Sequence, residues 1–402
     1  MSYKILQINS VCGRQSTGKI VTDLQKYIIA EGGDCRVAYG EKNSFPVNGD
    51  YHIGTEPQRY LHALSTRLFD NHGLCSASAT RGLIEFIKNY EPDIIHLHNI
   101  HGYYLNYPML FEFMTAQNIP AVWTMHDCWA VTGHCAHFDY TGCDKWKTGC
   151  YKCVQKNEYP ASFTDRSERN YKLKKKYFTM PANLTVVTPS DWLAKIIKQS
   201  YLNKYPVYTI PNGIRTEVFR PVTSDIRHRY SISEDKKVIL GVCNVWSFKK
   251  GFYDFIKLAG ILPEEYVVVM IGLNEKQIMQ LKGTNIIALP STDNMTDLVK
   301  WYSAADYFVN PTYEDTFPTV NLEALACGTP VITYKTGGSA ECLAEECGAT
   351  VLKGSIKEMA DVIIRNKFDK NKCVLQSQKY DYKKCFSSYN ELYKKILSTV
   401  SG

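Results

Sequence analysis

Short runs of apolar, β-branched residues alternate with longer amphipathic stretches from one end of the chain to the other. The run YKILQIN at 3–9 has the composition of a buried strand, and a glycine-bearing loop follows it. Beyond that loop, Ile20, Leu24, Tyr27 and Ile28 recur at helical spacing, and a pair of glycines then ends the predicted helix. Strands with two apolar faces, separated by helices, predict a parallel sheet covered on both sides.

The alternation continues through the first half and restarts with a predicted strand at 207–214, and a second series of strands and helices opens beyond a polar, charged stretch at 221–237. In the first half, further strands are predicted at 35–39, 93–98, 121–125 and 184–188. In the second half, strands are predicted at 207–214 and 236–244 and in the runs YVVVMIG, NIIAL, DYFVNP and PVITY. Each half therefore has enough elements for a doubly wound sheet of its own.

This pattern predicts an α/β protein with two Rossmann-like, doubly wound domains. We expect the first domain at 1–205 and the second at 206–375. The segment 376–402 reads as a C-terminal helix that packs back toward the first domain. Ligands of such sheets bind outside the carboxyl ends of the strands, so the cleft between the domains is the expected place for chemistry.

Composition narrows the class of protein. The chain has 402 residues, 45% of them hydrophobic, which excludes a disordered protein. The first residues lack a secretory signal and the apolar runs are too short to span a bilayer, so we expect a cytosolic protein with reduced thiols. The net charge is +7, and a basic segment at 169–178 is either a solvated face or a peripheral contact with anionic lipid. No nucleic-acid-binding motif accompanies it, and nucleic acid is not an expected partner.

The stretch YEDTFPTVNLEALACGTPVITYKTGGSAE at 313–341 carries the most specific pattern in the chain. Two acids, Glu314 and Asp315, precede Pro318, which suits the first turn of a helix. Glu323 then lies in the middle of that helix among leucines and alanines. A carboxylate in such surroundings is costly unless a group hydrogen-bonds it, either a surface partner or the hydroxyls of a ligand.

LEALACGTPV followed by G-G-x-x-E resembles the donor-binding signature of retaining glycosyltransferases of the GT-B fold, family 4. IPNGI, VNPTYED and PSDWLAK occur in the expected order, and the resemblance covers nearly the whole chain. It implies that Glu323 holds the ribose hydroxyls of a nucleotide. The first acid of the family's E-x7-E pair falls on Asp315, a shorter side chain, so contact with the donor sugar is expected from Asp315, from Glu314 or from a shifted backbone.

The resemblance also implies a diphosphate site. The helix start at Thr316, Phe317, Pro318 and Thr319 supplies free backbone N–H groups and a positive dipole end, which suits a diphosphate. Lys250 matches the family's diphosphate-binding lysine. Relatives commonly carry an arginine upstream, where this chain has none, and Lys249 is the candidate substitute. Gly18, expected at the first strand–helix turn, lets the backbone approach the donor or the acceptor.

Several histidines follow predicted strands at the carboxyl edge of the first domain. His126 and Asp127 come directly after the strand at 121–125 and invite an acid–base interpretation. By resemblance, His126 positions the donor sugar and need not be the general base, because the donor phosphate takes that role in retaining members. His96, His98 and His101 are expected at the same edge or as buried, hydrogen-bonded residues.

Four cysteines at Cys135, Cys143, Cys150 and Cys153 give the spacing C-x7-C-x6-C-x2-C. Four thiolates with one C-x2-C pair suit a structural zinc site. The alternative is a set of free, partly buried thiols in an aromatic-rich loop. Cys128, His134 and His137 are further candidate ligands.

Taken together, the resemblance implies a retaining, metal-independent glycosyltransferase that needs no cofactor for catalysis. A nucleotide-diphosphate sugar would bind mainly to the second domain, and a glycan or lipid-linked acceptor mainly to the first. The implied pathway is bacterial exopolysaccharide, capsule or lipopolysaccharide assembly, in the cytoplasm or at the inner face of the membrane. Two alternatives are a nucleotide-sugar epimerase or hydrolase of the same fold and a non-catalytic nucleotide-sugar-binding protein.

Overall fold

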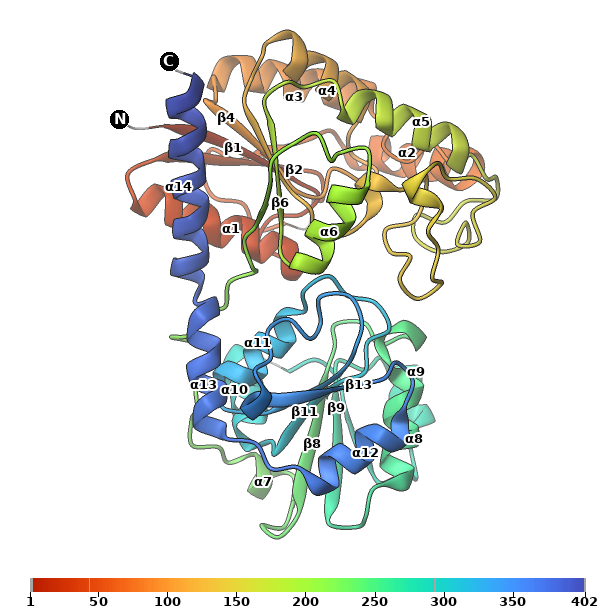
Figure 1. The fold of residues 1–402 in the computed structure, drawn as a ribbon, viewed down its shortest axis with the longest axis vertical. Coiled ribbons are helices and arrows are strands. Elements are labelled where there is room, and N and C mark those ends of the chain that lie inside the picture. The colour runs from red at the N-terminus through yellow and green to blue at the C-terminus, as the bar shows by residue number, and fades with distance from the viewer. Residues whose placement is uncertain (1–2, 43, 293, 401–402) are drawn as a thin grey trace. The chain divides into compact units, whose positions relative to one another are not determined.

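A computed structural model describes residues 3–42, 44–292 and 294–400, and they form two compact units (Figure 1). Unit 1 comprises residues 1–211 and 385–402, and unit 2 comprises residues 212–384. The predicted domains also take in residues 1–2, 43, 293 and 401–402, which lie outside the described part. No helix within the described ranges combines the length and apolar character needed to cross a bilayer.

Unit 1 contains a seven-stranded parallel sheet in the order β3-β2-β1-β4-β5-β6-β7. Its strands are β1 (Lys4–Asn9), β2 (Asp34–Tyr39), β3 (Tyr51–His52), β4 (Ile94–Leu97), β5 (Ala121–Thr124), β6 (Leu184–Thr188) and β7 (Val207–Thr209). Its helices are α1 (Gln15–Ala30), α2 (Glu56–Phe69), α3 (Ala77–Tyr90), α4 (Tyr107–Ala116), α5 (Ser167–Phe178), α6 (Asp191–Gln199) and most of α14 (Tyr382–Val400). Helices α3 and α4 cover one face of the sheet, and α1 and α6 the other (Figure 1).

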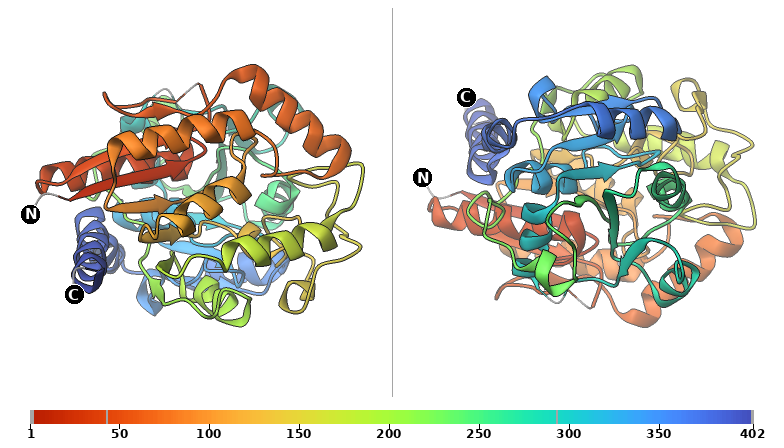
Figure 2. Two further views of the ribbon diagram at one scale, coloured as in Figure 1. Left: turned by 90° about the horizontal axis from the view of Figure 1, so that it is seen from above. Right: turned by 90° about the horizontal axis from the view of Figure 1, so that it is seen from below.

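Unit 2 contains a six-stranded parallel sheet in the order β10-β9-β8-β11-β12-β13. Its strands are β8 (Lys237–Val242), β9 (Tyr266–Ile271), β10 (Ile286–Leu289), β11 (Tyr307–Asn310), β12 (Val331–Tyr334) and β13 (Gly348–Val351). Its helices are α7 (Ile226–Arg229), α8 (Phe252–Ile261), α9 (Glu275–Gln280), α10 (Met295–Ala304), α11 (Thr319–Ala326), α12 (Ile356–Arg365) and α13 (Lys370–Ser377). They cover both faces of the sheet, as two further views show (Figure 2).

Both sheets owe their burial to the apolar runs seen in the sequence. All four residues of β4, β5 and β12 are buried, as a strand covered on both faces requires. The order of each sheet reverses once, between β1 and β4 in unit 1 and between β8 and β11 in unit 2. The predicted fold class, two doubly wound parallel sheets, is confirmed.

The division of the chain differs from the predicted one at two places. β7 pairs with β6 and so belongs to the first sheet, whereas the sequence placed 206 onward in the second domain. Unit 1 also resumes at residue 385 rather than 376, because α13 packs on α11 within unit 2. Both differences arise from pairings between distant segments, which local periodicity does not encode.

Helix α14 is fastened to the centre of the first sheet by buried hydrogen bonds. Tyr393 Oη lies 2.6 Å from Nδ1 of His96, which belongs to β4. Tyr389 Oη lies 3.0 Å from Thr124 Oγ1 at the end of β5, and Tyr3 Oη donates to Asn390. These tyrosines are buried, so each bond replaces water that has been removed.

The Tyr393→Phe variant is expected to lower the free energy of unfolding of the protein by about 1–3 kcal/mol, because Nδ1 of His96 would remain buried without its partner. Urea denaturation followed by circular dichroism measures this change. Tyr208→Phe is the matched control, since its hydroxyl meets Lys395 at the surface and its loss should cost less than about 1 kcal/mol. Equal effects of the two variants would contradict the role assigned to Tyr393.

Candidate active site

The loops that leave β8 and β11 meet at one edge of the second sheet, because these strands are neighbours at the reversal of strand order. Lys249 and Lys250 lie in the loop after β8, within a short 3-10 helix. Ser247 caps this helix, and its hydroxyl accepts from the N–H of Lys250 (3.3 Å). The cap places both lysines at the carboxyl edge of the sheet.

Two ion pairs join this loop to the acidic loop after β11. Lys250 Nζ lies 2.7 Å from Asp315 Oδ2, and Lys249 Nζ lies 2.8 Å from Glu314 Oε1. The backbones are linked too, because Tyr313 N–H donates to Lys249 O (2.8 Å). Burial disfavours the charged form of Lys250, but the Asp315 carboxylate outweighs this effect and raises the pKa of the lysine. Lys250 therefore carries its charge at physiological pH.

Glu314 has a carboxylate oxygen that its surroundings leave unsatisfied. Its side chain is only 7% exposed, and Oε1 is held by Lys249. Oε2 is buried and has no hydrogen-bond partner among the described residues. Asp315 differs, since its Oδ2 meets Lys250 and its Oδ1 accepts from Phe317 N–H (3.3 Å). A buried carboxylate oxygen without a donor is costly, so this position suits a hydroxyl from a ligand.

Helix α11 begins at the same edge of the sheet, directly after the acidic loop. Pro318 is its N-cap residue, and Thr316 and Phe317 just before it are buried. Glu323 lies in the middle of the helix, where its Oε2 accepts from Tyr302 Oη (2.9 Å). Tyr302 is fully buried in α10, so this bond fixes the orientation of the carboxylate. The first-turn N–H groups of α11 add a positive partial charge.

The glycine pair after β12 closes against the acidic loop. Gly338 N–H donates to the backbone oxygen of Asp315 (3.1 Å). Gly337 has a left-handed φ of 51°, and a Cβ added to it would stand 1.8 Å from the same oxygen. Only glycine fits there, so the position of Asp315 depends on Gly337.

In unit 1, His126 follows β5 and ends a row of hydrogen-bonded histidines. Its Nε2 lies 3.1 Å from Nδ1 of His98, whose Nε2 lies 3.1 Å from Gln7 Oε1. His96 lies beside His98, with ring centroids 4.0 Å apart. Burial lowers the pKa of His126 to about 4 and that of His96 to about 3. These side chains are therefore neutral at physiological pH.

Asp127 is paired with His101 rather than with His126. His101 Nε2 lies 2.8 Å from Asp127 Oδ2, and its Nδ1 lies 3.0 Å from Tyr159 Oη. Asp127 Oδ1 accepts from Trp129 N–H (2.8 Å). Burial alone would raise the pKa of Asp127, but the charge of His101 and these hydrogen bonds lower it to about 2. Asp127 is thus an ionised, fully engaged carboxylate and a poor general base.

Gly18 lies elsewhere than expected. It is buried in the first turn of α1 and not in the turn that precedes the helix. Its carbonyl accepts from Gly13 N–H (3.0 Å) and from Thr22 Oγ1 (3.0 Å). The loop at 10–14, which leaves β1, is therefore closed onto this glycine, and it supplies the backbone at the carboxyl end of β1.

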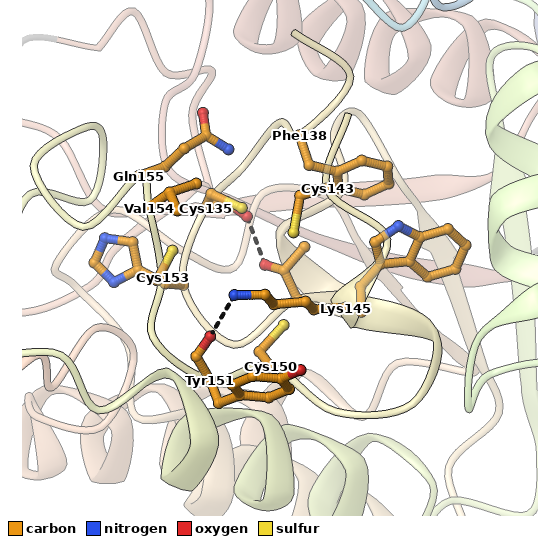
Figure 3. Close-up of a pocket in the computed structure, with 12 residues that line it drawn as sticks. Cys135, Phe138, Cys143, Lys145, Cys150, Tyr151, Cys153, Val154 and Gln155 are labelled. Atoms are coloured by element: carbon orange, nitrogen blue, oxygen red, sulfur yellow. Dashed lines mark hydrogen bonds between the residues drawn. The ribbon is translucent and has the colours of Figure 1, made fainter. Parts of the chain in front are cut away.

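The four predicted zinc ligands, Cys135, Cys143, Cys150 and Cys153, line one small cavity in unit 1 (Figure 3). None of the cysteines that the structure describes forms a disulfide bond. Of the other candidate ligands, His134 lies on the wall of this cavity, whereas Cys128 and His137 are not part of its lining. No three His, Cys, Asp or Glu side chains that the structure describes stand close enough together to hold a metal ion in the free protein.

Comparison with known proteins places these features in a family. Residues 17–218 match the model named Glycosyltransferase Family 4, and residues 223–380 match the model named Glycosyl transferases group 1. The first match covers half of the chain. The chain belongs to glycosyltransferase family 4.

Named relatives support the same family. WcaC of Escherichia coli (strain K12), a glycosyl transferase assigned to colanic acid biosynthesis, is 26% identical over 287 residues, 67% of each chain. D-inositol 3-phosphate glycosyltransferase 2 of Catenulispora acidiphila is 43% identical over 166 residues, which span 37% of this chain and 39% of that protein. The chain thus matches less than half the length of this second relative.

Solved structures define the fold as GT-B. Sucrose-phosphate synthase from Thermosynechococcus elongatus superposes with a TM-score of 0.74 at 17% identity, over 99% of this chain and 100% of that one. Anabaena Alr3699/HepE, solved in complex with UDP and glucose, gives a TM-score of 0.68 at 16% identity, over 98% and 100%. Identities this low show the fold alone.

Sequence reasoning missed three contacts around these predicted residues. Tyr302 orients Glu323 in the family 4 site, Lys249 pairs with Glu314 there, and Asp70 bonds to His134 beside the cysteine cavity. Each contact joins segments distant in sequence. A buried tyrosine or aspartate gives no local signal, so only the fold could reveal these partners.

The Gly337→Ala variant is expected to destabilise unit 2 by about 1–3 kcal/mol, because the added methyl group meets Asp315 O and the residue has a left-handed φ. Differential scanning calorimetry measures the change. Gly260→Ala is the control: this glycine lies exposed in α8 with nothing within 4 Å of an added Cβ, and alanine there should stabilise by about 0.5–1 kcal/mol. An unchanged melting temperature in Gly337→Ala would refute the proposed constraint.

Proposed function

We propose that this family 4 glycosyltransferase transfers a sugar from a nucleotide-diphosphate donor to a glycan or lipid-linked acceptor with retention of anomeric configuration. The observation that carries the proposal is the pairing of Lys249 and Lys250 with Glu314 and Asp315 at the edge where β8 and β11 end. Two cations, a helix N-terminus and an unsatisfied carboxylate oxygen match the groups of a sugar diphosphate.

Each residue then has a role that follows from its surroundings. Lys250 and Lys249 balance the charge of the diphosphate. In the free protein both lysines are paired with carboxylates, and the diphosphate competes with these carboxylates for the lysines. Glu314 accepts a hydroxyl of the donor sugar through its unsatisfied Oε2. Asp315 keeps Lys250 in position, and Glu323, fixed by Tyr302, accepts the ribose hydroxyls. These assignments favour Glu314 over Asp315 as the residue that contacts the sugar.

The reaction needs few protein groups beyond these. The bond between the anomeric carbon and the diphosphate oxygen breaks, and the acceptor oxygen bonds to the same face of that carbon. The departing phosphate oxygen takes the proton of the acceptor hydroxyl. Lys250, Lys249 and the first turn of α11 stabilise the charge that develops on the phosphate, so no metal or cofactor is required. His126, neutral and held by His98, orients the sugar.

Lys250→Met and Glu323→Gln are each expected to lower kcat/KM for the donor at least tenfold, about 1.4 kcal/mol, because each removes a group that contacts the nucleotide. Transfer is measured with a nucleotide sugar chosen by a thermal-shift screen of nucleoside diphosphates, and NMR reads the anomer formed. Lys257→Met is the control, since this lysine lies exposed on α8 beside Asp254.

The outcomes of this assay separate the alternatives. Wild-type kinetics in both variants would refute the site. An inverted anomer would refute retention. A new nucleotide sugar formed without any acceptor would favour an epimerase, and binding without transfer to any acceptor would favour a non-catalytic protein.

The proposed acceptor class is a saccharide of bacterial surface polysaccharide assembly, on the grounds of the likeness to WcaC. A lipid-linked acceptor would bring the protein to the inner face of the membrane. Helix α5, the basic segment, exposes Lys172, Lys175 and Lys176, whereas Lys174 is buried and Arg169 bonds to Asn71. The basic face is therefore narrower than the sequence suggests.

Replacing Lys172, Lys175 and Lys176 with glutamine should abolish flotation with vesicles that contain phosphatidylserine, because each exposed lysine adds about 1 kcal/mol near an anionic surface. The wild-type protein should float with these vesicles and remain behind with phosphatidylcholine alone. Lys257→Gln serves as a control for the loss of one exposed lysine outside α5. Equal flotation with both lipids would exclude the membrane contact.

A further inference from the structure

The segment between β5 and α5 is unusually long and irregular. Residues 125–166 contain no strand or α-helix and only two 3-10 helices, Trp129–Val131 and Lys145–Lys147. Loops of this length without structure of their own are uncommon in compact domains. Residues 125–138 are largely buried in the core of unit 1, whereas residues 139–166 bury few side chains, Trp146 the largest of them. Such a segment needs a further interaction within the loop to hold its conformation.

Four cysteines from three turns of this loop surround the cavity at its centre. The sulfur atoms of Cys135, Cys143, Cys150 and Cys153 are directed into it (Figure 3). Cys135 and Cys153 are close enough to share a hydrogen bond between their sulfur atoms. The space between the walls is about 20 Å³, which is room for one water molecule or one ion.

A histidine on the same wall has an unsatisfied nitrogen. His134 is 2% exposed, and its Nδ1 lies 2.8 Å from Asp70 Oδ1. Its Nε2 is buried and has no hydrogen-bond partner among the described residues. A carboxylate behind the ring is the support that metal-bound histidines have, which makes His134 the alternative to one of the thiolates as a ligand. The wall of the cavity thus carries both thiols and a buried imidazole nitrogen that no described side chain satisfies.

The loop packs closely around this cavity. A Cβ added to Gly133 would stand 2.7 Å from Cys150 Cβ and 2.1 Å from Ser167 O, so only glycine lets the His134–Cys135 segment approach Cys150. Cys153 N–H donates to Asp165 Oδ2 (2.6 Å), which holds the other side. These contacts bring the thiols together from positions up to 18 residues apart.

A buried lysine lies next to the thiols, and burial lowers its pKa to about 7. Lys174 of α5 is buried, donates to Trp129 O (2.7 Å) and lies 3.5 Å from the centre of the Trp129 ring. It is near enough to Cys135 and Cys150 for their charges to interact. A zinc ion with four thiolates carries two net negative charges, and a buried lysine offsets part of that charge.

We propose that Cys135, Cys143, Cys150 and Cys153 bind a structural zinc ion that fastens this loop. Each thiol loses its proton on coordination, and the ion replaces the hydrogen bond between Cys135 and Cys153. In the free protein, no three described donor side chains stand close enough together to bind one metal ion. The loop therefore contracts around the ion when it binds. The site is independent of transfer chemistry, and it stabilises the segment that follows His126 and Asp127.

The test uses the full chain, purified under reducing conditions without added metal. Mass spectrometry of the metal content should find about one zinc ion per chain. Cys150→Ser and Cys153→Ser should each reduce this to below about a tenth. Cys75→Ser is the matched control, because Cys75 is a half-buried thiol of unit 1 that bonds to Ser65 outside the cavity, and it should keep its zinc.

Two measurements on the wild-type chain guard against variants that fail to fold. Exchange with Co²⁺ should give the near-ultraviolet charge-transfer bands of thiolate ligands, and a chelator should lower the melting temperature in a way that Zn²⁺ restores and Mg²⁺ does not. Absence of bound zinc together with no effect of the chelator would overturn the proposal, as would disulfides among these cysteines in reduced protein.

A separate test decides whether Cys135 or His134 is the fourth ligand. His134→Asn should retain zinc, because the four thiolates complete the tetrahedron and asparagine can still donate to Asp70. Loss of zinc in this variant, with retention in Cys135→Ser, would overturn the four-thiolate assignment and make His134 a ligand in place of Cys135.

Discussion

The contact between the lysines after β8 and the acids after β11 is the interaction on which the second unit's chemistry depends. Four charged groups lie at one sheet edge, and each carboxylate is tolerated there because an ammonium group is within 3 Å of it. Removing Lys249 would leave the Glu314 carboxylate buried without compensation. In the proposed function, the same pairing keeps the lysines in place before the donor diphosphate binds, so little ordering remains to be done on binding.

The first unit places its polar groups differently. Its row of histidines runs from His126 through His98 to His96, and Tyr393 of α14 ends it. These groups are neutral and hydrogen-bonded, so this row is polar without being charged. In the proposed function, the second unit offers charge for a phosphate and this row offers neutral donors and acceptors, which suit sugar hydroxyls.

Much of this followed from the sequence. Apolar runs indicated the buried parallel strands. The resemblance carried by LEALACGTPV and G-G-x-x-E singled out the acidic loop and Glu323, and the position before Gly251 singled out Lys250, which the structure brings together with Asp315. What the sequence did not reveal depends on long-range contact. The pairing of β7 with β6, the bond from Tyr302 to Glu323 and the support of His134 by Asp70 all join segments far apart in the chain. The unsatisfied Oε2 of Glu314 is a property of packing, and no residue pattern predicts it.

Helix α14 has a consequence for how the chain is made. Its residues from 385 onward complete the first unit, yet they are synthesised after the whole of the second. During synthesis, His96 and Thr124 therefore have no contact with Tyr393 and Tyr389 until the second unit has been made, and the part of the first sheet that α14 covers stays exposed until then. A gene fragment that stops at residue 211 would encode the same incomplete intermediate, and adding the helix as a separate peptide is the natural way to complete it.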